Sequence, residues 1–147
     1  MELLSFAGGA VCGVAMACII IEIIKKSSMD MKNQEINQEQ LLEECFGEAM
    51  YASTYSFEKA KKWIKAHKQL LKNGANALVM KVNEETIKVI KKDVNIEGEP
   101  ENYLVIAIIN EKSQKMEESL LVKYGRLDAN LENILAKGNG MLVVEGE

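Results

Sequence analysis

The run YLVIAII at residues 103–109 decides the fold, because it is the most apolar segment of the chain outside the N-terminal region. A short continuous apolar run that is bounded by polar residues is typical of a strand buried on both faces of a sheet. The polar residues from Glu111 to Gln114 predict a turn, and Ser119 to Tyr124 predicts a strand that returns antiparallel. This hairpin is the predicted core of the domain.

Two more strands are predicted on the N-terminal side of this hairpin. Residues 78–82 alternate with a period of two, which is typical of a strand. Thr86–Lys91, TIKVIK, predicts its hairpin partner, although Asn83 followed by two glutamates could start a short helix instead. The β-branched residues favour the strand. The only proline lies in Gly98-Glu99-Pro100, which predicts a turn before the core hairpin.

A short helix and a last strand are predicted on the C-terminal side. Asp128 has the position of an N-cap, and Gly138 has the position of a residue that ends a helix. The last strand is MLVV, Met141–Val144, which we expect beside a strand already in the sheet. The residues of the short helix that should face inward are Leu131, Ile134 and Leu135.

The segment between residues 38 and 72 has the period of one long amphipathic helix. Asn37 is its predicted N-cap, and a cation followed by glycine in Lys72-Asn73-Gly74 predicts its end. Such a helix would be about 50 Å long, which exceeds the width of a domain of this size. Because the polar stretch Tyr51–Ser56 is a poor helix former, we expect a kink or a second helix start near residues 53–56.

The N-terminal stretch Leu3–Ile24, LLSFAGGAVCGVAMACIIIEII, predicts a transmembrane helix. It contains one charged residue, Glu22, and as a helix it would be roughly 33 Å long, close to the thickness of the hydrocarbon core of a bilayer. A cleaved signal peptide is the alternative, since Ala15-Met16-Ala17 precedes Cys18 as in a lipoprotein site. The absence of a positive n-region and the apolar run at residues 19–24 favour the uncleaved helix.

The flanks of this stretch predict its orientation, and one of its faces predicts self-association. Lys25, Lys26 and Lys32 follow the stretch, and no basic side chain precedes it, so the positive-inside rule places residues 27–147 in the cytoplasm. Small residues spaced four apart would let a second helix approach closely, as in small-xxx-small pairs. These candidate helix–helix contact residues are Gly9, Gly13 and Ala17.

Together these patterns predict an α+β fold with three parts. Residues 1–26 form a transmembrane anchor, residues 27–36 form a flexible tether, and residues 37–147 form one soluble domain. In that domain we expect one long, kinked helix packed on a mainly antiparallel sheet of about five strands, with one short helix before the last strand.

The composition of the soluble part excludes several classes of function. Residues 27–147 hold 20 acidic and 16 basic side chains, once Glu2, Glu22, Lys25 and Lys26 are left out, so general nucleic-acid binding is disfavoured. The cysteines lie at positions 12, 18 and 45, which leaves no pair for a disulfide in the soluble domain and suits a reducing cytosol. One histidine and no CxxC motif argue against a metal site, and no cofactor motif is present.

Each residue that could take part in catalysis or ligand binding has a structural explanation that is stronger than the functional one. His67 is the only residue with an ordinary pKa near neutrality, but the sequence shows no partner for a catalytic triad. Cys45 is more often a small core residue than a nucleophile. Gly138-Asn139-Gly140 follows a predicted helix and precedes a strand, which is the reverse of a phosphate-binding loop. We therefore predict no catalytic residue.

The second half of the long predicted helix is basic and its first half is acidic. This distribution matches the helix dipole, which is sufficient to explain it. The functional alternative is contact with the anionic inner leaflet of a membrane. The residues that would make this contact are Lys61, Lys62, Trp63, Lys65 and Lys68.

These observations favour a single-pass membrane protein whose cytoplasmic domain binds a protein partner and is not an enzyme. Sheet edges and the polar side of the long helix are the predicted docking surfaces. The alternative is a membrane-active or host-interaction factor of a mobile element, holin-like or of the exclusion type, that acts by oligomerisation of its glycine-spaced helix. A third hypothesis is a membrane-tethered hydrolase or transferase that uses His67.

Overall fold

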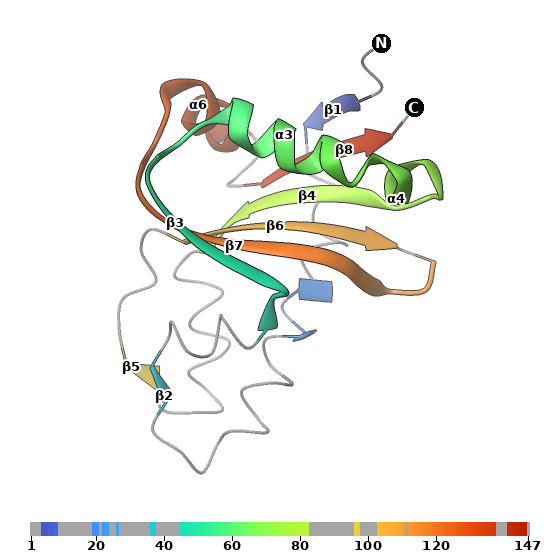
Figure 1. Ribbon diagram of the computed structural model, residues 1–147, viewed down its shortest axis with the longest axis horizontal. Helices are drawn as coiled ribbons and strands as arrows, with labels where there is room; N and C mark the ends of the chain where they lie inside the picture. Colours follow the sequence, from blue (N-terminus) through green and yellow to red (C-terminus); the bar gives the residue numbers. More distant parts are fainter. Residues whose placement is uncertain are drawn as a thin grey trace.

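The computed structural model describes residues 4–8, 19–20, 22–23, 26, 36–37, 45–82, 96–97, 103–110, 112–137 and 141–146. It shows an α+β fold that is built on a mixed sheet with the strand order β1-β8-β4-β6-β7-β3. Figure 1 shows the helices that it labels gathered on one side of the sheet.

Three antiparallel strands form the centre of the sheet. Strand β6 (Tyr103–Asn110) lies between β4 (Asn76–Lys81) and β7 (Lys115–Leu127). Strands β6 and β7 form a hairpin in which Ile106 is opposite Leu120. All residues of β6 from 103 to 109 are buried. This confirms the predicted core hairpin and its central strand buried on both faces.

Two strands from the ends of the chain extend one side of this centre, and a strand from the middle of the chain extends the other. Strand β8 (Met141–Gly146) pairs antiparallel with β4, which confirms the predicted last strand, and β1 (Leu4–Gly8) pairs antiparallel with β8. On the other side, β3 (Glu48–Tyr55) pairs with β7 in parallel. A separate parallel pair joins β2 (Ile36–Asn37) and β5 (Ile96–Glu97).

Capping residues mark the ends of the described helices. Helix α3 (Phe57–Ala66) is capped by the Ser56 side chain, which accepts a hydrogen bond from the backbone N–H of Lys59 at 3.1 Å. Helix α4 (Lys68–Lys72) has Asn73 as its C-cap, and Gly74 follows with a φ of 98°, which suits glycine. Helix α6 (Ala129–Lys137) starts where Asp128 Oδ1 accepts from the N–H of Leu131 at 2.9 Å, which confirms Asp128 as an N-cap.

The prediction of one helix from residue 38 to residue 72 is wrong. Cys45 is helical, but Glu48–Tyr55 is a strand, and the next helix begins at Phe57, next to the predicted second start near residues 53–56. Glutamate, alanine and methionine at the start of this segment favour helix, but pairing with β7 overrides that weak preference. Asn37, the predicted N-cap, lies in β2.

The sheet buries apolar side chains on both faces. The helix-covered face packs against α3, α4 and α6 through residues such as Ile64, Leu71 and Leu131. We call the opposite face the second face. Its strand residues include Leu78, Val105, Ala107, Ile109, Leu121 and Val143, and they cluster with Ile20, Cys45 and Phe46.

The predicted transmembrane stretch is described only in part. Leu4–Gly8 forms β1, and residues 19–20 and 22–23 are helical. Within the described residues, no helix is long and apolar enough to cross a membrane. Gly9, Gly13 and Ala17 lie outside the described residues, as do Thr86–Lys91, Gly98–Pro100 and Gly138–Gly140. The transmembrane anchor and its helix–helix contact therefore stay predictions.

Candidate functional site

His67 lies at the junction of α3 and α4, where its contacts are with its own helix. Its Nδ1 is 2.9 Å from the carbonyl oxygen of Trp63, and its ring centroid is 4.2 Å from that of Trp63. Its backbone N–H donates to Ile64 O at 3.0 Å. These contacts fit a histidine that closes the C-terminal end of a helix.

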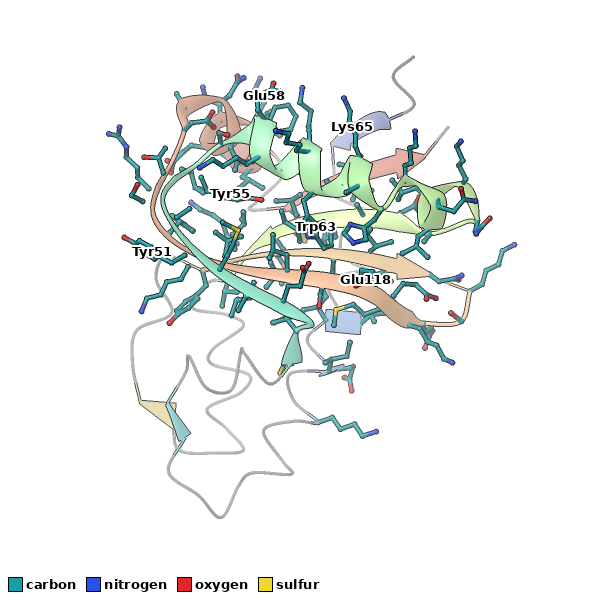
Figure 2. The ribbon with its side chains drawn as sticks, in the orientation of Figure 1. Tyr51, Tyr55, Glu58, Trp63, Lys65 and Glu118 are labelled. Atoms are coloured by element: carbon teal, nitrogen blue, oxygen red, sulfur yellow. The ribbon has the colours of Figure 1, made fainter. Side chains whose placement is uncertain are left out.

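The residues predicted to touch a membrane do not share one environment. The Trp63 Nε1–H donates to Glu48 Oε2 at 2.9 Å, so Trp63 is turned toward β3. The Lys61 Nζ forms a salt bridge with Glu58 Oε1 at 3.0 Å and lies 4.9 Å from the centroid of the Phe57 ring. Lys62, Lys65 and Lys68 are exposed. Figure 2 shows Lys65 pointing away from α3 and Trp63 pointing toward the strands. Membrane contact by these residues stays a prediction.

Cys45 is buried against the second face, beside Phe46. Among the described residues, no group of three or more histidine, cysteine, aspartate or glutamate side chains could hold a metal ion.

The candidate site is the outer edge of β3, the edge that faces away from β7. The backbone groups of β3 that point toward β7 show which of its other backbone groups point outward. The Tyr55 carbonyl accepts from the N–H of Asp128 at 3.0 Å, just past the end of β7. The Ser53 carbonyl points at Gly125 of β7, where an added Cβ would lie 2.6 Å from it. Since successive peptide groups of a strand point to opposite sides, those of Ala52 and Thr54 point away from β7.

The outward carbonyl of Thr54 confirms this alternation. It accepts a hydrogen bond from Lys59 Nζ at 3.1 Å, so a side chain of α3 covers the C-terminal end of the edge. The Thr54 hydroxyl accepts from Arg126 Nε at 3.3 Å, which places a second cation at the same end. This end of the β3 edge therefore carries two cationic side chains, and the Asp128 carboxylate lies near them, where it accepts from the N–H of Phe57 at 3.3 Å.

The other end of the edge carries apolar side chains in solvent. Met50 is 40% exposed and Tyr51 is 66% exposed, and both are large hydrophobic residues. Adjacent strand residues point to opposite faces, so Met50 shares the side of Ala52, which packs on the helix-covered face, and Tyr51 lies on the other side. Figure 2 shows Tyr51 pointing outward from β3, whereas Tyr55 points toward α3. The edge thus offers one apolar side chain above and one below its backbone.

Two buried tyrosines lie close to this edge. Burial raises the pKa of Tyr55 from 10.0 to about 12. Burial, and secondly the negative charge of Glu132, raises the pKa of Tyr124. Both side chains pack on the helix-covered face, so the edge lies next to the buried apolar core.

The sequence alone did not identify this edge, because residues 48–55 were assigned to a helix. One signal was present: Tyr51 and Tyr55 flank serine and threonine in a stretch that favours strands. Comparison of the chain with protein-family models, curated proteins and solved structures found no match.

Proposed function

We propose that this chain is a protein-binding module that takes an extended segment of a partner protein along the outer edge of β3. The observation that carries the proposal is the position of β3 at the end of the sheet, with residues 48–51 all exposed. An exposed strand edge presents unpaired N–H and C=O groups that can pair with a further strand. Met50 and Tyr51 would supply apolar contacts on the two faces of that added strand.

Charge along the edge indicates what the partner segment carries. Lys59 and Arg126 both lie at the Thr54 end, so an acidic side chain of the partner would be favoured there. Apolar side chains would be favoured near Met50 and Tyr51. The proposed partner is therefore a protein with an extended segment that is apolar at one end and acidic at the other.

Membrane attachment is part of this proposal, and catalysis is not. The hydropathy of Leu3–Ile24 and the lysines that follow it support an anchor with the domain on the cytoplasmic side. The module would then hold its partner at the membrane, where tethering raises the effective concentration of a weak binding site.

The test is site-specific photocrosslinking in the native cell. A photoreactive amino acid replaces Tyr51, and in the control it replaces Gln69, which is exposed on α4. We expect an adduct with a second protein from position 51 and none from position 69. The partner identified in this way is then purified and its binding is measured.

Binding should be weakened by a charge on the edge. Met50→Lys should lower the affinity for the purified partner by about tenfold or more, because a lysine on an edge strand opposes strand addition. Gln69→Lys adds the same charge elsewhere and should leave the affinity unchanged. A crosslink between two copies of this chain would contradict a different partner protein and would show that the edge binds a second copy. Absence of any adduct at position 51 would refute the proposal.

A further inference from the structure

Ile20 lies inside the predicted transmembrane stretch and is the most deeply buried of the described side chains in that stretch. Its side chain is 0% exposed and is among the largest fully buried side chains of the described residues. It belongs to the cluster on the second face of the sheet, and Ile19 and Ile23 pack against the same cluster. Figure 1 shows the helical pieces near residue 20 on the side of the strands away from α3.

The exposed and buried positions here have the pattern of a helix that lies on a surface. Ile20 is buried and Ile19 and Ile23 are half-buried, whereas Glu22 and Lys26 are exposed. Residues four apart share one side of a helix, so Glu22 and Lys26 lie together on a polar side that adjoins the side of the isoleucines. This arrangement leaves the charge of Glu22 in water, whereas a bilayer would have to accommodate it.

The second face needs a cover of this kind. Leu78, Val105, Ala107, Ile109 and Val143 are all 0% exposed on that face. Apolar sheet faces are stable when another apolar layer packs on them, and a bare face of this kind would bind lipid or protein. Cys45 and Phe46 cover part of the face, and the isoleucines supply the other described part of the cover.

We propose that the second face of the sheet is a docking site for Ile19, Ile20 and Ile23 of the same chain, and that a bilayer competes with it for these isoleucines. A side chain cannot pack on Val143 and lie among acyl chains at once, so membrane insertion of this stretch uncovers the sheet. Attachment to a membrane would then depend on the stability of the docked state. This inference is independent of the β3 edge.

The test uses the full chain and variants that weaken the docking face without changing the N-terminal stretch. Val143→Thr places a hydroxyl on the second face, and Val144→Thr places the same group on the helix-covered face of the same strand. Both valines are 0% exposed. The measurement is co-flotation with vesicles of equimolar phosphatidylcholine and phosphatidylglycerol, together with thermal unfolding without lipid.

Val143→Thr should raise the vesicle-bound to free ratio by about tenfold over that of Val144→Thr, since an unsatisfied hydroxyl on the docking face favours release of the isoleucines. Both variants should lower the unfolding temperature without lipid by a similar amount. A second pair, Val105→Thr and its control Val122→Thr, should repeat the difference, because these valines also lie on opposite faces and are fully buried. Equal vesicle binding within each pair, or no binding by any form, would overturn the proposal.

Discussion

Strand residues on both faces of the sheet are buried, but the two faces are covered in different ways. The helix-covered face is closed by α3, α4 and α6, each joined directly to a strand of the sheet. The described cover of the second face comes from Ile19, Ile20, Ile23, Cys45 and Phe46, which lie between β1 and β3 in the sequence. Short connections hold α3, α4 and α6 close to the sheet, whereas the stretch from Gly8 to Glu48 that carries this cover is long, so the cover depends more on its packing. One face is therefore closed by helices in short connections, and the other depends on its contacts.

The largest expected effect compares one isoleucine from each cover. Ile64 of α3 is 1% exposed and Ile20 is 0% exposed. Ile64→Ala should lower the free energy of unfolding by roughly 2–5 kcal/mol, because truncation of a buried isoleucine leaves a cavity. Ile20→Ala should cost a similar amount if the second face is closed by this stretch in solution. The measurement is urea-induced unfolding of the full chain without lipid.

Glu22→Gln is the control for that pair, since Glu22 is an exposed neighbour of Ile20. It should change the free energy of unfolding by less than about 0.5 kcal/mol. An Ile20→Ala variant as stable as the wild type would show that Ile20 does not pack on the sheet in solution.

The second effect concerns alkaline pH and the helix-covered face. The unfolded chain releases the proton of Tyr55 near pH 10.0, whereas burial holds the folded pKa at about 12. The folded state therefore binds more protons between these values, so stability is full below pH 10 and falls as pH rises toward 12. The loss should be roughly 2–3 kcal/mol. Urea unfolding across this range should show a shallower fall in Tyr55→Phe than in the wild type, and parallel curves would contradict the assignment.

The third effect concerns the attachment of β3 to the sheet. Gly125→Ala should lower stability by about 1–3 kcal/mol, because the new Cβ would meet the backbone carbonyl of Ser53. Gly47→Ala is the matched control, since its added Cβ would lie 3.8 Å from the nearest atoms of Ser119. Hydrogen exchange of β3 amides measures the effect. Equal exchange in the two variants would mean that β3 does not approach Gly125 closely.

The smallest effect concerns the cap that joins two helices on the helix-covered face. Asp128 Oδ1 accepts from the N–H of Leu131 at 2.9 Å and from that of Phe57 at 3.3 Å, so it touches the starts of both α6 and α3. Asp128→Ala should cost about 1 kcal/mol in thermal unfolding. Asp128→Asn keeps an oxygen acceptor and should recover most of that loss. A full loss in both variants would assign the effect to charge and not to the cap.

Local signals in the sequence predicted the central and C-terminal parts of the fold. The run at residues 103–109 is apolar at every position, which leaves a buried strand as the best explanation for a segment of that length. Asp128 has the side chain and spacing of an N-cap, and the structure shows the expected hydrogen bond. Neither feature depends on residues that are distant in the sequence.

The sequence did not predict β3 or the candidate site on it, because both depend on distant pairing. Glu48, Ala49 and Met50 favour helix when taken alone, and only their position beside β7 makes them a strand. The requirement for glycine at position 125 is likewise visible only once Ser53 lies against it. The exposure of Tyr51 could not be read from its neighbours, because an isolated aromatic residue is as often buried.

The pairing of β3 with β7 joins residues that are 72 positions apart, as in the contact of Thr54 with Arg126. Residues of β3 and α3 are therefore synthesised well before those of β7, and during that interval β3 cannot pair with β7. Long-range pairing of this kind is slow relative to closure of the β6–β7 hairpin, whose strands are joined by residues 111–114. On a nascent chain arrested before residue 115, β3 should be open to added protease, and synthesis of β7 should protect it. The edge proposed to receive a partner would thus join the sheet only after β7 has been made.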